Sequence, residues 1–284
     1  MTKRQHPDIA RRVQPAPQNW LQRIASWFVF ISRRRLDRRF SVLMLPQSVM
    51  CVALAAVAVA ILVWFADKPY LQAVRGGATR DQVFFELITY LGLSDWILWA
   101  SGLVMLVFTV STADRFAGPL HRLWHRLMLT AYFLFTAVAL SGLITNGLKI
   151  VFGRARPPQV AGEGPWEAMP FTADYDFASF PSGHATTSGA LTLCLVLLFP
   201  RFRWLFIALG LAVAVSRNFI GVHFPSDVLA GLVVGTGFTF LWARSFARKR
   251  LLFRFTDNGG IELRGEGQGH LHRWPELLGR AGKR

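Results

Sequence analysis

Long uncharged runs alternate with short polar segments along this chain. A helix rises about 1.5 Å per residue, so about 20 apolar residues cross a hydrocarbon layer about 30 Å thick. Runs without Asp, Glu, Lys or Arg lie at 45–66, 96–113, 127–148, 184–199, 204–216 with an apolar continuation to Val222, and 228–243. This pattern predicts an all-α integral membrane protein with six transmembrane helices. We expect the fourth and sixth, which are short, to borrow a turn from flanking residues.

Basic segments flank this apolar region on both sides. We predict an N-terminal tail over 1–44, a membrane domain over 45–243 and a C-terminal tail over 244–284. Because Asp67-Lys68-Pro69 follows the first apolar run, with no small-residue cleavage site, we expect that run to be retained rather than removed as a signal peptide.

Each tail contains one segment with a structural signal. In the N-terminal tail, the run from Trp20 to Phe28 and the arginines after it suggest either an interfacial helix on an anionic leaflet or a solvated stop before the first span. In the C-terminal tail, Asn258-Gly259 lies between two apolar runs, a pattern typical of a small hairpin.

Charge predicts the orientation. The chain has 32 Lys and Arg against 16 Asp and Glu, although 52% of its residues are hydrophobic. Lys and Arg accumulate on the cytoplasmic side of membrane proteins. The two tails and the 114–126 and 200–203 loops together hold 25 of them, whereas the alternate loops hold 7. We therefore expect both termini to be cytoplasmic.

Three polar segments interrupt the apolar chain on the opposite, outward side. They lie at 149–157, 181–184 and 216–227. The first leaves the third predicted helix, the second opens the fourth, and the last joins the fifth to the sixth. Helix packing is therefore expected to bring all three together at one membrane face.

These segments contain the groups that bind a phosphate dianion. Lys149, Arg156 and Arg217 supply three cations, and the two guanidinium groups can each hold two phosphate oxygens. Ser182 and the backbone N–H of Gly183 begin a predicted helix, where free N–H groups and the positive end of the helix dipole favour anions.

Two histidines and an aspartate supply the reactive groups. Pro225 suits the first position of a helix, so Asp227 falls in its first turn and can reach back to one ring nitrogen of His223. This predicts His223 as the nucleophile, which forms a phosphohistidine, and Asp227 as the residue that orients it. His184 is then the proton donor to the leaving oxygen and later the base for water. One imidazole must be neutral and the other protonated, which predicts a bell-shaped pH dependence.

Taken singly, each group has a structural explanation: outward cations that reach lipid headgroups, a helix cap, a polar His–Asp contact. Together they match the signature K-x6-RP, PSGH and SR-x5-H-x3-D, and the chain resembles the type-2 phosphatidic acid phosphatase superfamily. The matching positions are Lys149, Arg156, Pro157, Pro181, Ser182, Gly183, His184, Ser216, Arg217, His223 and Asp227. The resemblance, which covers roughly 45–243, implies a six-helix phosphatase core, an outward site, metal-independent hydrolysis and the roles above.

The resemblance also implies a lipid substrate: undecaprenyl pyrophosphate, phosphatidylglycerol phosphate, phosphatidic acid or a lipid A phosphate. We expect the 158–180 loop, with Trp166, Phe171, Tyr175 and Phe177, to shape that choice. We expect no cofactor, no metal and no nucleic-acid partner. Heavy use of Arg over Lys, 27 against 5, hints at a bacterium, and the inner membrane with a periplasmic or exterior site is the expected location. The sequence does not indicate an oligomeric state.

Two other functions fit parts of the pattern. A lipid phosphotransferase would use the same site, with a second lipid in place of water. An anion transporter usually places ionisable groups near the membrane midplane, and the six predicted spans lack them. Gly231 and Gly235 in the last span favour close helix packing over a transporter hinge. Cys51 and Cys194 lie within spans, where a packing role is expected.

Overall fold

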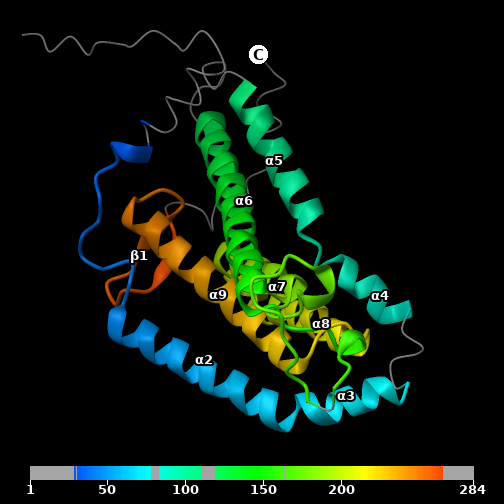
Figure 1. Cartoon of the computed structure of the whole chain (residues 1–284). Coiled ribbons are helices and arrows are strands. Elements are labelled where there is room, and N and C mark those ends of the chain that lie inside the picture. Colours follow the sequence, from blue (N-terminus) through cyan, green and yellow to red (C-terminus); the bar gives the residue numbers. More distant parts are fainter. Residues whose placement is uncertain (1–28, 30, 78–82, 111–118, 163, 265–284) are drawn as a thin grey trace, which may run out of the picture.

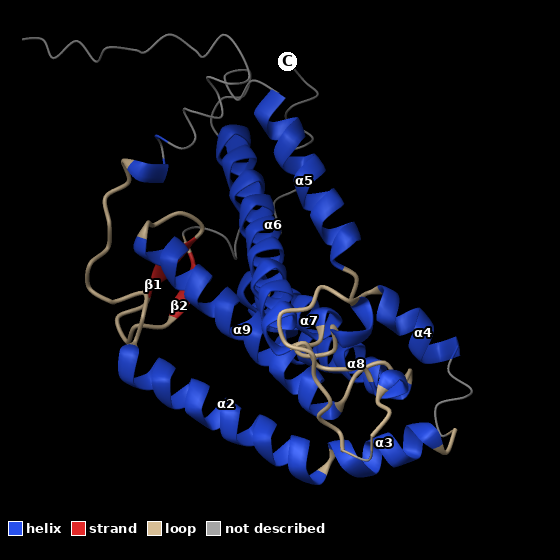
Figure 2. Ribbon diagram, in the orientation of Figure 1, coloured by secondary structure: helices blue, strands red, loops and turns tan. Residues whose placement is uncertain are grey.

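The computed structural model describes residues 29, 31–77, 83–110, 119–162 and 164–264, and these residues are mostly helical (Figures 1 and 2). The helices are α2 (Leu45–Phe65), α3 (Asp67–Arg75), α4 (Val83–Tyr90), α5 (Ser94–Val110), α6 (Pro119–Phe152), α7 (Gly183–Leu198), α8 (Arg203–Phe219) and α9 (Pro225–Arg248). Single 3-10 turns lie at Pro157–Gln159, Tyr175–Phe177 and Pro200–Phe202, and the strands are β1 (Phe253–Phe255) and β2 (Ile261–Leu263). The predicted interfacial segment from Trp20 to Phe28 lies outside the described residues.

Each of the six predicted apolar runs lies mostly in a helix where the structure describes it, although Ala66, Phe199 and residues 220–222 fall just beyond helix ends. Among the described residues, five helical segments are long and apolar enough to cross a membrane: Leu45–Phe65, Val83–Phe108, Arg122–Phe152, Pro200–Phe219 and Pro225–Arg248. The remaining run forms α7, an apolar helix of 16 residues. The chain is thus a mostly helical membrane protein, and a sixth crossing through α7 stays a prediction.

The helix α7 lies at the centre of the bundle and packs most closely against α9 (Figure 1). Glycines make this approach possible. A Cβ on Gly231 would collide with the backbone oxygen of Ser182, and one on Gly235 with that of Thr186. On the facing helix, a Cβ on Gly189 would lie 2.9 Å from the Leu232 oxygen. The prediction that Gly231 and Gly235 allow close packing is confirmed.

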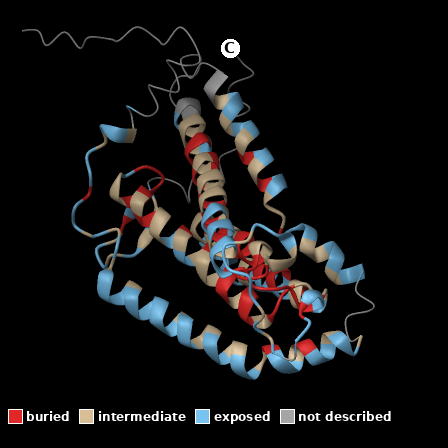
Figure 3. Ribbon diagram, viewed as in Figure 1, coloured by how far each residue is buried: buried red, intermediate tan, exposed pale blue. Residues whose placement is uncertain are grey.

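The helix α2 has the opposite character. It packs along α9, yet no residue of α2 is buried, and its apolar side chains are exposed along its length (Figure 3). An all-apolar helix with its side chains exposed is stable in lipid, where backbone polar groups are satisfied within the helix. Cys51 is among these exposed residues.

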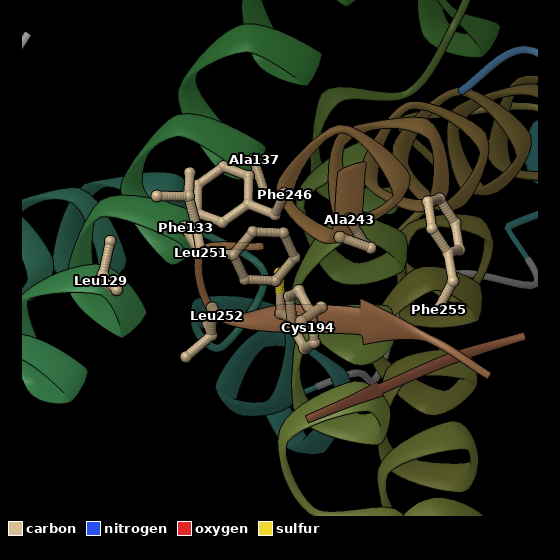
Figure 4. Packing of buried hydrophobic residues seen from close by; sticks show 11 residues of the cluster. Leu129, Phe133, Ala137, Cys194, Ala243, Phe246, Leu251, Leu252 and Phe255 are labelled. Atoms are coloured by element: carbon tan, nitrogen blue, oxygen red, sulfur yellow. The ribbon is translucent and has the colours of Figure 1, made fainter. Parts of the chain in front are cut away.

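An aromatic cluster closes the end of the bundle at which α9 terminates. Phe133 of α6 meets Phe246 of α9 and Phe253 of β1 edge to face, with ring centroids 5.1 and 4.9 Å away. Cys194 is fully buried in the same cluster, in the packing role expected of it (Figure 4).

The predicted hairpin is present next to this cluster. The strands β1 and β2 pair antiparallel, and Gly259 in the turn has φ of +77°, a backbone conformation that favours glycine. Arg244 of α9 donates to the backbone oxygens of Ser41, Val42 and Gly259. This one side chain therefore ties the segment before α2 and the hairpin to α9.

Candidate active site

The first predicted segment begins in the last turn of α6, which carries Lys149. Gly153 ends the helix with φ of +52°, and a Cβ there would collide with the backbone oxygen of Met169. Beyond it the chain is extended and pairs with the loop through an isolated bridge between Arg154 and Ala168. Extended backbone sends successive side chains to opposite sides, so Arg154 and Arg156 can share one direction.

The starts of α7 and α9 are joined directly. Ser182 is the N-cap of α7, and its hydroxyl oxygen accepts from the Ala185 N–H at 3.5 Å. Its own backbone N–H donates to the Asp227 carbonyl at 3.0 Å. As predicted, Pro225 opens α9 and Asp227 lies in its first turn, where one carboxylate oxygen accepts from the Phe224 N–H at 2.9 Å.

His223 lies between α8 and α9, nearly fully buried. Its Nδ1 is 3.6 Å from Asp227 Oδ2, slightly beyond hydrogen-bond length, and has no other partner among the described residues. Asn218 donates to the His223 carbonyl at 2.9 Å and fixes the backbone there. Burial lowers the pKa of the His223 imidazole to about 4, although the nearby Asp227 carboxylate acts in the opposite direction. The ring is therefore neutral at pH 7.

The predicted cations gather around the two histidines. The Lys149 ammonium lies 3.7 Å from the position that a Cβ on Gly183 would occupy, so it faces the start of α7. His184 is close enough to Arg217, His223, Lys149 and Arg156 to experience the charge of each. The three sequence segments thus converge on one site, as the sequence predicts.

Among the described residues, Arg156 and Arg217 each keep N–H donors that have no hydrogen-bond partner. Arg156 donates through Nε to the Tyr175 carbonyl at 3.0 Å and lies over the Tyr175 ring at 3.9 Å, and burial lowers its pKa. Arg217 donates through Nη1 to the Thr89 hydroxyl at 2.9 Å, and its buried Nε has no partner within the described part of the chain. These remaining N–H groups match the oxygens of a phosphate.

Asp227 is the centre of a buried polar network that the sequence did not reveal. Its Oδ1 accepts from Arg154 Nη1 at 2.6 Å, and its Oδ2 accepts from the Ser179 hydroxyl at 2.6 Å. Arg154 also donates to Asp67 Oδ2 at 2.8 Å and to the Ser226 hydroxyl at 2.7 Å, and both carboxylates are fully buried. Asp67 in turn accepts from the Ser226 hydroxyl.

Two further site neighbours come from the end of α4 and the turn that follows it. The hydroxyl of Thr89, in α4, accepts a hydrogen bond from Arg217. Gly92 packs against the reactive centre, because a Cβ there would lie 3.3 Å from His184 Cδ2 and 2.8 Å from a Val213 methyl group. Neither residue belongs to the signature, and an isolated Thr or Gly before an apolar run carries no signal in the sequence.

The four aromatic residues of the 158–180 loop that were predicted to shape substrate choice divide into two pairs. Trp166 packs over the Arg154 guanidinium at 4.4 Å, and Phe177 packs against the buried cluster that contains Phe224. Phe171 and Tyr175 are exposed at the surface, at 79% and 68% of their full area. Within the described ranges, no group of three or more His, Cys, Asp or Glu side chains converges.

Comparisons with known proteins identify the family of the chain. The PAP2 superfamily matches residues 130–251. The lipid A 1-phosphatase of Rhizobium etli is 38% identical over 220 residues, which are 75% of this chain and 90% of that protein. The undecaprenyl-diphosphatase BcrC of Bacillus subtilis is 36% identical over 108 residues, covering 37% of this chain and 52% of that protein.

One solved structure is also similar. The transmembrane PAP2-type phosphatidylglycerolphosphate phosphatase of Bacillus subtilis aligns with a TM-score of 0.49 at 22% identity, over 69% of this chain and 93% of that one. The family assignment depends instead on the extent of the Rhizobium match and on the matched residues 130–251. The chain belongs to the PAP2 superfamily, and its relatives indicate a phosphatase.

Proposed function

We propose that this chain hydrolyses a lipid phosphate ester through a phosphohistidine on His223. The observation that carries the proposal is the convergence of His223, Lys149, Arg156 and Arg217 around His184, with Lys149 and Arg156 also close to His223. Because Nδ1 of His223 faces Asp227, the other ring nitrogen, Nε2, is the atom that attacks phosphorus. The cations neutralise the phosphate oxygens as charge moves onto them in the transition state.

Hydrolysis takes place in two steps, each of which forms one bond to phosphorus and breaks another. In the first, the Nε2 lone pair forms a bond to phosphorus, the ester P–O bond breaks, and His184 gives its proton to the departing lipid oxygen. In the second, His184 takes a proton from water, the water oxygen bonds to phosphorus and the P–N bond breaks. Inorganic phosphate leaves and both imidazoles return to their starting states. A bound dianion also favours the protonated form of His184 that the first step requires.

Lipid A carrying a 1-phosphate is the substrate that we propose first. The Rhizobium etli lipid A 1-phosphatase matches three quarters of this chain, whereas the undecaprenyl-diphosphatase BcrC matches 37% of it. The extent of a match favours one substrate class only as analogy, so phosphatidic acid, phosphatidylglycerol phosphate and undecaprenyl pyrophosphate are its competitors. Tyr175, whose ring lies against Arg156, and Phe171 are both exposed, and we propose that they contact the rest of such a lipid.

We further propose six crossings, with both basic tails in the cytoplasm and the site on the periplasmic side of a bacterial inner membrane. The 25 to 7 distribution of Lys and Arg supports this orientation. Reporter fusions after residue 264 and within the 158–180 loop test it. A periplasmic signal from the first fusion would reverse the assignment.

The decisive experiment measures phosphate release in detergent from each of these four lipids, supplied singly and with EDTA present. Wild-type protein is expected to release phosphate fastest from lipid A 1-phosphate, and His223→Ala and His184→Ala to lose activity by about 10⁴-fold. His184→Ala, which retains the nucleophile, is expected to accumulate an acid-labile phosphoenzyme when the leaving group needs no proton.

Three outcomes change the proposal. Release that requires a second lipid would make the chain a phosphotransferase. Activity lost with EDTA and restored by a divalent cation would overturn metal-independent hydrolysis. A His223→Ala protein with wild-type activity would overturn the assignment of the nucleophile.

A further inference from the structure

Arg154 is a buried arginine in the signature segment, and its contacts differ from those of its neighbour Arg156. A guanidinium group has five N–H donors. In Arg154, Nη1 donates to Ser226 and Asp227, Nη2 donates to Asp67 and the Pro165 carbonyl, and Nε donates to the same carbonyl at 3.3 Å. All five donors are therefore used within the protein, and none remains for a phosphate oxygen.

The surroundings of Arg154 hold its guanidinium group rigidly. The Trp166 ring lies on one side at 4.4 Å from the guanidinium carbon, and the Phe224 ring lies at 4.0 Å. The side chain is fully buried. An arginine held by two rings and five hydrogen bonds cannot move toward a substrate without breaking several contacts at once.

The partners of Arg154 connect two distant parts of the chain to the nucleophile. Asp67 begins α3, immediately after α2, whereas Asp227 lies in the first turn of α9 beside His223. The Ser226 hydroxyl adds a second connection between Arg154 and Asp67, because it accepts from Arg154 and donates to Asp67. Burial raises the pKa of Asp67, while the hydrogen bonds from Ser226 and Arg154 act in the opposite direction. One buried cation is therefore shared between two buried carboxyl groups.

We propose that Arg154 is a positioning residue that holds the Asp227 carboxylate beside His223, with Asp67 fixing the far side of the guanidinium. The inference rests on the proposed function, which assigns the attack on phosphorus to His223. Arg154 acts on the reaction only through Asp227, because its contacts place no donor toward the phosphate-binding residues. Its loss is expected to change turnover rather than substrate binding.

The charge of Arg154 also sets the pH range of the site. His223 faces Asp227 and lies near Arg156, Lys149 and His184, and all of these remain when Arg154 is replaced. Without the guanidinium, the Asp227 and His223 pair takes up a proton more readily. The active state, with a neutral imidazole and an ionised carboxylate, is then lost at a higher pH than in the wild type.

The test compares Arg154→Gln, Arg154→Lys and Asp67→Asn with the matched control Arg75→Gln. Arg75 of α3 holds the same loop, because it donates to the Val160 and Gly162 carbonyls, but it contacts no carboxylate among the described residues. For each purified protein, kcat, KM and the midpoint of the acid limb are measured by phosphate release, and folding by thermal unfolding in detergent.

Arg154→Gln is expected to lower kcat by about 100-fold with KM within about threefold, because a misplaced reactive pair slows chemistry and not binding. Its acid limb is expected to move up by about 1 pH unit. Arg154→Lys keeps the charge but loses the planar guanidinium group that donates to several acceptors at once. Its acid limb is therefore expected to stay in place while kcat falls by about tenfold. Asp67→Asn is expected to lower kcat by about tenfold, and Arg75→Gln to match the wild type.

Several results would overturn the inference. One is a folded Arg154→Gln protein with wild-type kcat and acid limb, and another is a loss that appears wholly in KM or equally in Arg75→Gln. If Arg154→Gln does not fold, Arg154→Lys decides: wild-type kcat would overturn the proposal and a tenfold loss at an unmoved acid limb would support it. An inactive wild type would count against the proposed function instead.

Discussion

The two ends of α9 each bury an arginine between aromatic rings. Near one end, Arg244 lies 4.9 Å from the Phe255 ring and 5.8 Å from the Phe240 ring, and it donates to backbone carbonyls. At the other end, Arg154 lies between Trp166 and Phe224 and donates to two carboxylates.

The difference lies in the partners and not in the burial. A carbonyl oxygen carries no net charge to be redistributed, so Arg244 fixes chain segments and has no route to a reaction. A carboxylate beside an imidazole couples the arginine to protonation. A buried arginine thus takes on a chemical role only when its partners are charged, and four measurements test this conclusion.

The largest effect is expected at Asp227. Replacing it with Asn keeps the volume but removes the charge opposite Arg154 and the acceptor that faces His223. We expect kcat to fall by about 10⁴-fold, as for the orienting carboxylate of other His-dependent enzymes. Arg244→Gln is the counterpart at the other end, with a lower unfolding temperature but wild-type kcat. Equal losses of kcat in the two variants would erase the distinction between the ends.

Gly92→Ala tests how closely the reactive end is packed. The added methyl group would lie 2.8 Å from a Val213 methyl group and 3.3 Å from His184 Cδ2, so one of them must move. A shift of the general acid by a fraction of an ångström is expected to lower kcat by about 100-fold. Gly142→Ala, where no atom lies within 4 Å of the new methyl group, is the control. Unchanged phosphate release by Gly92→Ala would show that His184 tolerates displacement.

The acid limb of kcat/KM, which reports the enzyme without substrate, follows from the buried imidazole. Because burial lowers the pKa of His223 to about 4, the neutral nucleophile persists as pH falls through 6 and 5, and is lost below about 4. The value of kcat/KM at pH 3 is therefore expected to be about tenfold lower than at pH 5. An acid limb near pH 6.5, the ordinary value for histidine, would mean that His223 is not buried in the working enzyme.

The smallest effect is expected at Thr89. Thr89→Val removes the hydroxyl that receives the Arg217 hydrogen bond but preserves the shape of the side chain. Loss of one such bond is worth about 1 kcal/mol, which corresponds to a rise in KM of about fivefold with little change in kcat. Thr136→Val removes the partner of the Trp242 indole N–H near the opposite end, and its KM should not change. A fall in kcat alone for Thr89→Val would move Thr89 into the chemistry.

The sequence predicted the elements whose physics is local. The lengths of the apolar runs predicted the spans, Pro225 predicted the start of α9, and Asn258-Gly259 predicted the hairpin turn. The eight candidate site residues were predicted because their spacing is a known signature and because a phosphate needs cations beside a nucleophile. Their convergence in space follows from helices that begin and end at one face.

The remainder of the site depends on contacts between distant residues. Arg154 and Asp67 are 87 positions apart, and neither signature spacing nor periodicity links them. The one signal in the sequence for this network was Asp67, which directly follows an apolar span, since a carboxylate next to the membrane requires a partner. Gly92 and Thr89 gave no signal, because their importance arises only when α4 packs against α8.

The hydrogen bond from the Ser182 N–H to the Asp227 carbonyl joins the first turns of two helices through main chain alone. His184 and His223, the proposed proton donor and nucleophile, therefore keep their mutual spacing whatever side chains surround them. The 158–180 loop, with Phe171 and Tyr175, can therefore change to fit a differently shaped lipid while the spacing between His184 and His223 stays constant.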